Sequence, residues 1–296
     1  MAELAGVLAA MLSSALGGSS IAATRYLAAS VDPLTIGAFR FGIGVLFLLP
    51  AVLLHRNRWP APQDWLGAAM LGLLFFAVFP ILFNASLAYT TAARGALALS
   101  TLPLLTMLAG ALLGVEPLTG RKTIGVFAAM AGVAVALLSG LSTSPAGAWR
   151  GDLLMVAAAL CMALYNVWSK PFIQRSGAIP FTAMSMAVGA VCLVLIAWLS
   201  GGFAVVSTFG TAHWLAVGFL GLFGSALTFF LWAFALGRTT PTRVAISVTV
   251  NPIMASFLGA TLLGEPLGWN LFAGLLTVFI GIWFATTTRG RKAAAS

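Results

Sequence analysis

GALLGVEPL (residues 110–118) and GATLLGEPL (residues 259–267) close two apolar runs of this chain with almost the same letters. The two stretches lie 149 residues apart, close to half of the 296-residue length. When residues 90–132 are compared with 239–281 without a gap, thirteen of the 43 positions are identical. The chain therefore contains two copies of one unit.

A second, weaker match supports the duplication. Residues 6–25 align with residues 151–170 at an offset of 145. Within the stronger match, the residue types that shape helix ends and close contacts are repeated, namely Arg94/Arg243, Pro103/Pro252, Gly110/Gly259, Glu116/Glu265, Pro117/Pro266, Gly125/Gly274 and Gly132/Gly281.

The composition excludes a water-soluble domain. The chain is 61% hydrophobic and 7% charged, with a mean hydropathy of +1.06, whereas a soluble domain has about a quarter charged residues. Its outer surface must therefore face the lipid bilayer. The net charge of +9 does not indicate a nucleic-acid partner, because the basic residues form no patch and recur at the ends of apolar runs.

Ten apolar runs are long enough to cross a bilayer as helices, which needs about 20 residues each. We therefore predict an all-α membrane protein with ten transmembrane helices. Residues 1–140 would form the first five-helix repeat, 151–287 the second, and 288–296 a basic cytoplasmic tail. The predicted spans are 4–27, 34–54, 66–88, 92–114, 122–140, 151–172, 180–200, 213–236, 241–263 and 268–287.

The distribution of Lys and Arg predicts the orientation. With a cytoplasmic N-terminus, the cytoplasmic segments hold 11 of the 15 basic residues and the opposite side holds three, which satisfies the positive-inside rule. Both termini should then be cytoplasmic. The first run carries Glu3 and no basic region before it, so we expect it to be retained as a spanning helix.

An odd number of helices in each copy decides how the copies are related. If the first copy starts inside, the second starts outside, so the two must be inverted repeats related by an axis in the membrane plane. Inverted repeats are typical of secondary transporters, in which two similar halves rock around a central site. The alternative is that duplication simply builds a large bundle.

The repeated Glu-Pro sites have a structural interpretation. Proline cannot continue a helix, so Pro117 and Pro266 should end equivalent helices on opposite membrane faces, with small residues at Gly110 and Gly114. We expect the glutamates at the membrane surface, where water solvates their charge, and not at a coupling site.

The whole chain resembles the drug/metabolite transporter superfamily of the ten-helix EamA type. The likeness rests on the five-plus-five repeat, the G-x-x-x-x-x-EPL helix ends and FRF at residues 39–41. It implies ten helices around a central cavity and the export of small organic metabolites. The chain is also similar to bacterial aromatic amino-acid exporters, which implies a location in the bacterial inner membrane.

Two prolines suggest where a substrate could bind. Pro103 and Pro252 lie near the middle of equivalent spans, and each lacks the N–H that would bind a carbonyl one turn earlier, at Leu99 and Val248. Such carbonyls should face protein or a wet cavity. The alternative is a packing kink without ligand contact.

Hydroxyl, amide and aromatic side chains recur on single helix faces at similar depth. Each stripe alone is equally well explained by interhelical packing, but together they would suit an amphipathic, partly apolar solute. The candidate substrate-binding residues are Ser13, Gly17, Phe79, Phe83, Ser100, Pro103, Tyr165, Trp168, Ser225, Trp232, Asn251 and Pro252.

Arg40 is the charge that falls clearly within a span. A buried arginine in a membrane is usually paired or faces a cavity. Three interpretations remain open: it attracts a substrate carboxylate, it forms a gating ion pair with Asp32 or Glu265, or its side chain reaches toward the interface.

The function predicted from the sequence is a secondary transporter that exports small amphipathic metabolites, with aromatic amino acids favoured. An exporter of drugs or other metabolites is the alternative, and a channel or an intramembrane enzyme is less favoured. No catalytic constellation, metal site or cofactor site is expected. No acid lies in the middle of a span, so proton coupling through a buried carboxylate is not expected. We expect the protein to function as a monomer.

Overall fold

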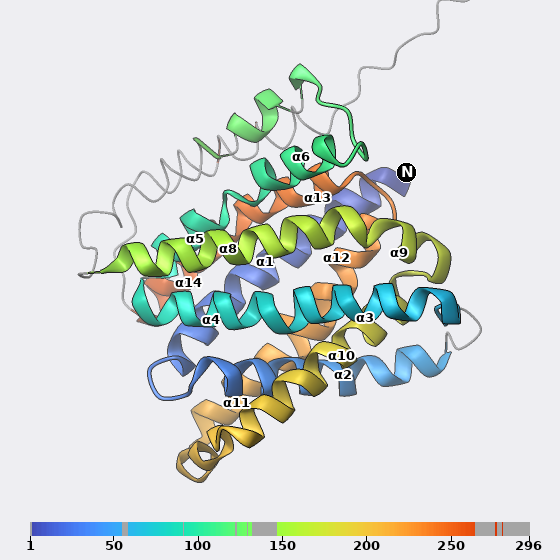
Figure 1. Cartoon of the computed structure of the whole chain (residues 1–296). Coiled ribbons are helices and arrows are strands. Elements are labelled where there is room, and N and C mark those ends of the chain that lie inside the picture. The colour runs from blue at the N-terminus through green and yellow to red at the C-terminus, as the bar shows by residue number, and fades with distance from the viewer. Residues whose placement is uncertain are drawn as a thin grey trace, which may run out of the picture.

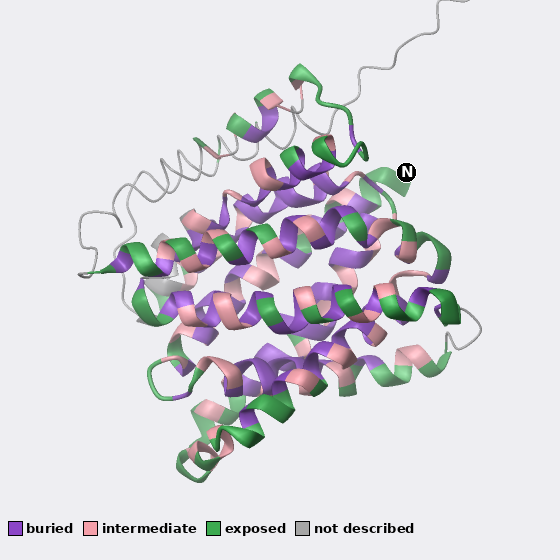
Figure 2. Cartoon of the chain, viewed as in Figure 1, coloured by how far each residue is buried: buried purple, intermediate pink, exposed green. Residues whose placement is uncertain are grey.

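A computed structural model describes residues 2–54, 59–90, 92–121, 123–128, 130–131 and 147–263, together with Leu276 and Ile280. Within these ranges the chain is helical and contains no strand. The long helices lie roughly side by side in one bundle (Figure 1). Buried residues face its interior and exposed ones cover its outside (Figure 2).

Among the described residues, six helical segments are long and apolar enough to cross a membrane, as the hydropathy pattern predicts. Their ends match the predicted spans to within a few residues. They are α1 (Ala2–Leu27), α2 (Pro33–Leu54), Pro62–Tyr89, α8 (Ala148–Trp168), α10 (Ala178–Leu199) and Thr211–Leu236.

The outer surface carries large apolar side chains, as expected for contact with lipid. Leu54 is 84% exposed, Leu112 86% and Leu199 79%. In water such exposure over a whole bundle would favour aggregation, whereas in a bilayer these side chains meet acyl chains. The composition and the surface therefore agree on a membrane environment.

Two further helices are interrupted near their prolines, as predicted. In the first copy, α5 (Ala92–Leu99) and α6 (Leu102–Leu112) are separated at Ser100 and Thr101. In the second copy the 3-10 helix η6 (Ser247–Val250) separates α13 (Pro241–Ile246) from α14 (Asn251–Leu263).

One detail of this prediction is wrong. The Val248 carbonyl is not left without a backbone partner, because the Asn251 N–H donates to it. The tighter 3-10 bond replaces the bond that Pro252 cannot make. The interruption therefore costs less than an orphaned carbonyl would.

Two long segments contain π-helical turns that the sequence did not predict. Pro62–Tyr89 consists of the short 3-10 helix η2 (Pro62–Asp64), α3 (Trp65–Leu73), the π segment η3 (Leu74–Val78) and α4 (Phe79–Tyr89). Thr211–Leu236 consists of α11 (Thr211–Gly221), the π segment η5 (Leu222–Leu227) and α12 (Thr228–Leu236). The two π segments occupy equivalent positions in the two copies.

Glycines bring the two copies into close contact, and the contacts recur in exchanged form. A Cβ on Gly72 would lie 2.4 Å from the carbonyl oxygen of Ser185, and one on Gly189 2.4 Å from the Cβ of Phe76. These contacts join α3 and η3 to α10. The equivalent contacts join α11 and η5 to α2, through Gly221 against Ile43 (2.3 Å) and Gly44 against Ser225 (2.8 Å).

The helices α1 and α8, which correspond in the two copies, run in opposite directions. α1 begins at the end of the bundle marked N, whereas α8 begins at the other end and finishes near α9 (Lys170–Ser176) (Figure 1). Contacts agree with the picture. Gly6, near the start of α1, lies close to Thr239, and Lys170, just after α8, donates to the Thr239 carbonyl. We call the end where α1 begins the amino end.

Several predicted elements lie wholly or mainly outside the described residues. These are the spans at 122–140 and 268–287, the second Glu-Pro site at Glu265, and the tail at 288–296. The predicted number of ten helices therefore stays a prediction. Between α10 and α11, the chain forms the 3-10 helix η4 (Gly202–Thr208).

Candidate functional site

A small cavity lies where the two copies meet in the bundle. The space open to the centre of a water molecule is about 40 Å³. Six lining residues come from the first copy and six from the second, which are Ser13, Ser14, Gly17, Arg40, Phe79, Phe83, Met162, Thr228, Phe229, Trp232, Val248 and Asn251.

The walls of the cavity reflect the internal repeat. α1 and α4 contribute from the first copy, and α8 and α12 are their counterparts in the second. Three pairs of lining residues occupy equivalent positions at the repeat offsets, namely Gly17 and Met162, Phe79 and Thr228, and Phe83 and Trp232.

Arg40 extends from α2 toward the π segment of the other copy. Its Nε donates to the Ser225 hydroxyl (3.2 Å) and its Nη2 donates to the Gly224 carbonyl (2.7 Å). The guanidinium carbon also lies 5.9 Å from the ring centre of Phe229. Arg40 is 4% exposed, so its side chain lies inside the bundle and does not extend to the outer surface.

The predicted ion pair between Arg40 and Asp32 does not form. The Asp32 carboxylate accepts the backbone N–H groups of Leu34 and Thr35 and so caps the start of α2. The other predicted partner, Glu265, lies outside the described residues. Among the described residues, no carboxylate pairs with Arg40.

The π segment explains how a helix can bind Arg40 with its own backbone. A π turn shifts the hydrogen bonding by one residue and changes which carbonyls the helix itself satisfies. Gly224 lies in η5, and its carbonyl accepts from Arg40. Nearby, the Thr228 hydroxyl donates to the Phe223 carbonyl (2.6 Å), and the Ser13 hydroxyl donates to the Thr228 carbonyl (2.7 Å).

A hydrogen-bonded chain of side chains positions the indole ring at the cavity. Trp232 Nε1 donates to Asn166 Oδ1 (2.8 Å), and Asn166 Nδ2 lies 3.5 Å from the Thr106 hydroxyl. Asn166 is fully buried on α8. Asn166 was not among the residues predicted from the sequence, although an amide inside an apolar span indicates a polar partner.

The interrupted helix of the second copy is anchored to α1. Ser14 and Ser247 share a hydrogen bond (2.8 Å), and Ser247 also lies 3.1 Å from the Ala10 carbonyl. Asn251 follows η6 and faces the cavity beside Gly17. A Cβ on Gly18 would come within 2.5 Å of the Asn251 carbonyl, so only glycine permits this approach.

The structure brings seven of the thirteen predicted site residues to the cavity, namely Ser13, Gly17, Arg40, Phe79, Phe83, Trp232 and Asn251. It adds five that were not among the candidates. Thr228 could have been predicted from the sequence, because it shares a helix face with Trp232. Val248 was named in the sequence analysis only for its backbone carbonyl. The added residues are Ser14, Met162, Thr228, Phe229 and Val248.

The other six candidates do not line the cavity. Ser100 donates to the Ala96 carbonyl, one turn earlier (2.8 Å). The Ser225 hydroxyl accepts a hydrogen bond from Arg40 Nε. Tyr165 is buried and stacks on Phe75 (4.1 Å). Trp168 is 43% exposed on the outer surface. The remaining two are the helix-breaking prolines, Pro103 and Pro252.

Glu116 is not solvated at the surface, contrary to the prediction. It is 6% exposed, and its Oε1 accepts the Thr242 N–H (3.1 Å) at the start of α13. A carboxylate at a helix N-terminus satisfies an orphan donor and the positive end of the helix dipole. The chain reverses over the end of α6, with Gly114 at φ +66°. The first Glu-Pro site therefore joins the two copies.

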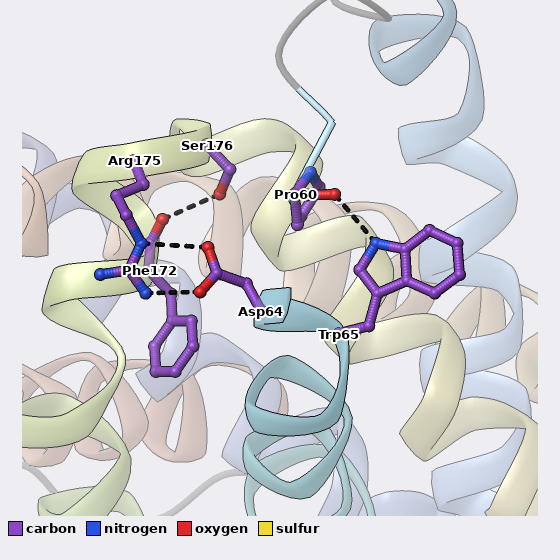
Figure 3. A network of polar contacts seen from close by, with 6 residues as sticks. All are labelled: Pro60, Asp64, Trp65, Phe172, Arg175 and Ser176. Carbon is purple, nitrogen blue, oxygen red and sulfur yellow. Dashed lines mark hydrogen bonds and ion pairs between the residues drawn. The ribbon is translucent and has the colours of Figure 1, made fainter. Parts of the chain in front are cut away.

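Other polar contacts also close the amino end. Glu3 forms an ion pair with Arg243. Arg175 binds the Asp64 carboxylate with Nε (3.0 Å) and Nη2 (2.7 Å), beside the bond from Trp65 to the Pro60 carbonyl (Figure 3). The hydrogen bonds that Arg175 donates to the Asp64 carboxylate raise the pKa of the half-exposed Arg175. Each ion pair links one copy to the other.

The cavity offers groups that can bind a solute. Among its described lining residues there is no Asp, Glu, His or Cys. Among the described residues, no group of three such side chains could hold a metal ion. The site offers one cation, hydroxyls, one amide and an aromatic wall.

Comparisons with known proteins identify the family to which the chain belongs. The model of the EamA-like transporter family matches twice, at residues 4–138 and 149–287. The chain is 32% identical to the uncharacterized protein PA1977 of Pseudomonas aeruginosa, covering 90% of this chain and 88% of that protein. It is 28% identical to the uncharacterized inner membrane transporter YedA of Escherichia coli, covering 84% and 80%.

A distant relative and a solved structure agree with this result. The uncharacterized transporter YyaM of Bacillus subtilis is 23% identical, over 91% of this chain and 89% of the relative. A crystal structure with 22% identity matches with a TM-score of 0.73, over 96% of this chain and 97% of that one, which supports the fold alone. The chain is a multi-pass membrane transporter and not an enzyme, and it belongs to the EamA-like transporter family.

Proposed function

We propose that this transporter exports small amphipathic metabolites by alternating access, and that its substrates are amino acids, with aromatic ones favoured. The main observation in support is the cavity, which is lined by six described residues from each copy. It lies beside the two matching π segments, which Phe79 and Thr228 directly follow, and at the break η6 of the second copy. Interrupted helices of this kind mark the substrate sites of transporters with internal repeats.

The inverted relation of the two copies is part of this proposal. Exchanged contacts support it, since α10 packs on α3 and η3 in the same way that α2 packs on α11 and η5. In an isologous arrangement, an element of one unit meets its partner in the other unit and the reverse contact also forms. The opposite directions of α1 and α8 support an axis across the bundle.

A change of conformation is required for transport. The cavity of about 40 Å³ can hold water but not an amino acid, and small-molecule pockets usually measure roughly 300–1,000 Å³. Contacts such as Glu3–Arg243 and Glu116–Thr242 hold the amino end together. On the positive-inside orientation this end faces the cytoplasm, so these contacts must open before a substrate enters from the cell.

The aromatic wall would also suit lipophilic drugs, which is the alternative proposal. Phe79, Phe83, Phe229 and Trp232 line one cavity. The fixed charge of Arg40 opposes cations, however, and its burial strengthens that repulsion. The cavity therefore favours neutral, zwitterionic or anionic solutes over the lipophilic cations that many drugs present.

Counterflow in proteoliposomes tests the proposal. Vesicles with the purified protein would be loaded with an unlabelled amino acid and given labelled phenylalanine, a labelled aliphatic amino acid or a labelled lipophilic cation. We expect exchange of phenylalanine above the level of protein-free vesicles. Exchange of the cation without any amino acid would refute the proposed substrate class and favour a drug exporter.

A further inference from the structure

Arg40 carries binding capacity that the protein itself does not use. A guanidinium has five N–H groups, and the described contacts of Arg40 use one on Nε and one on Nη2. Both N–H groups of Nη1 have no acceptor among the described residues. Arg40 is 4% exposed and lines the cavity, so its charge is buried at the space between the two copies.

Among the described residues Arg40 contacts only neutral groups, so its buried charge is incompletely compensated. The Gly224 carbonyl and the Ser225 hydroxyl offset part of the cost of removing the charge from water. A carboxylate would offset more, because charge-assisted hydrogen bonds to arginine are short, strong and often bidentate. The free Nη1 and the remaining N–H of Nη2 form such a pair of donors.

Asn251 supplies the complementary feature. Its Oδ1 is buried and has no hydrogen-bond partner among the residues that the structure describes, and the residue lines the same cavity. A buried acceptor without a hydrogen bond destabilises the protein, because it has lost its bond to water. A solute that donates a hydrogen bond, above all an ammonium group, would remove that cost. Asn251 stands on the second copy and Arg40 on the first.

The remaining lining residues determine which side chain the ligand can have. Apart from hydroxyls, it consists of aromatic and aliphatic side chains. These can accept a hydrophobic group, and their rings can stack on an aromatic one. They are Phe79, Phe83, Met162, Phe229, Trp232 and Val248.

We propose that Arg40 binds the α-carboxylate and Asn251 Oδ1 the α-ammonium of one amino acid, whose apolar side chain meets the aromatic wall. This inference rests on the proposed function and specifies its binding mode. Since the two residues belong to different copies, a bound zwitterion bridges both halves of the transporter. A solute lacking either charged group would lose one of the two contacts.

Matched ligands and variants test the assignment. Inhibition of phenylalanine counterflow would be measured with phenylalanine, phenylalaninamide, which lacks the carboxylate, and 3-phenylpropionate, which lacks the amine. The variants are Arg40→Gln, Arg40→Lys and Asn251→Leu. Arg150→Gln is the control, because Arg150 is exposed beside Trp149 and lies outside the cavity.

We expect Arg40→Gln to weaken inhibition by phenylalanine about tenfold or more while inhibition by phenylalaninamide changes less than about threefold. Arg40→Lys should retain part of the preference for the carboxylate. Asn251→Leu should reduce the preference for phenylalanine over 3-phenylpropionate. Arg150→Gln should leave all three ligands unchanged. Because each variant is judged by a ratio of ligands, a smaller folded fraction does not change the result.

Two results overturn the inference in different ways. If the wild type exchanges phenylalanine but Arg40→Gln weakens phenylalanine and its amide equally, Arg40 has a structural role and the binding mode is refuted alone. If the wild type exchanges no amino acid while another solute is exchanged, the proposed function fails and the binding mode fails with it.

Discussion

The contact between Gly189 and Phe76 gives a sharp test of how the two copies pack. A Cβ added at Gly189 would lie 2.4 Å from the Cβ of Phe76 and 2.6 Å from its backbone carbon. Carbon atoms normally stay about 3.5–4.0 Å apart, so α10 and η3 would have to separate by about 1 Å. Gly189→Ala should therefore cost about 1–3 kcal/mol in overpacking.

The higher helix propensity of alanine stabilises the protein and so partly offsets the cost of overpacking. A control variant is needed to separate the two effects. Alanine is favoured over glycine in a helix interior by about 1 kcal/mol. Gly218 of α11 is also helical, and a Cβ there would meet nothing within 4 Å. Gly218→Ala should therefore stabilise the protein slightly. The difference between the two variants isolates the packing cost, since both gain the same methyl group.

The assay is reversible unfolding of the purified variants in mixed detergent micelles. We expect the free energy of unfolding of Gly189→Ala to lie about 1–3 kcal/mol below that of Gly218→Ala. If the two variants unfold at the same denaturant concentration, helices in this bundle adjust freely and the close contact does not hold the copies together.

Three further predictions follow from the polar groups. Glu116→Ala should remove the charge-assisted bond to Thr242, worth about 1.5–3 kcal/mol, and speed the thiol labelling of Ser14→Cys from the amino end. Glu116→Gln, which keeps an acceptor, should label more slowly, and equal rates would contradict this. Asp64→Asn should lower the free energy of unfolding by less than about 1 kcal/mol, because Arg175 is half exposed; a larger loss in chemical unfolding would contradict it. Counterflow should vary less than about twofold between roughly pH 6 and 8, because the cavity lining has no group that titrates there; a steep pH profile would contradict it.

The parts of the fold that depend on local sequence could be predicted. Long apolar runs require helices in a bilayer, and a proline removes a particular backbone hydrogen bond, so the interruptions near Pro103 and Pro252 follow from single residues. The π segments could not be predicted in this way. No residue in Leu74–Val78 forces a π turn, and its neighbours in the bundle decide whether the turn forms.

The site was predicted less completely than the fold, because the sequence of an apolar helix does not show which face is buried in the protein. Trp232 and Trp168 lie in similar stripes, yet the first is 2% exposed and the second 43%. In a soluble helix, polar residues mark the outside, but lipid-facing and buried faces of a membrane helix have similar composition. Only the packing of neighbouring helices separates the two tryptophans.

Glu116 shows the same limit for a charged residue. Its position before a proline correctly predicts a helix end, and α6 ends at Leu112. Its partner, Thr242, is 126 residues away in the other copy. A local pattern identifies the orphan N–H groups of a helix start but not the distant carboxylate that caps it, so solvation by water was the wrong expectation.

The irregular turns connect the architecture to the proposed mechanism. A regular α-helix satisfies its interior carbonyls with its own backbone and offers no polar group sideways. Here η5 presents the Gly224 carbonyl to Arg40, and η6 places Asn251 at the cavity. The first copy has a π segment and a helix break at the equivalent places. Each copy therefore contains two irregular helices, and the second copy lines the cavity with residues from both of them. In the proposed rocking mechanism the two copies exchange these geometries, which moves the closed end across the bundle while α1, α2, α8 and α10 stay intact.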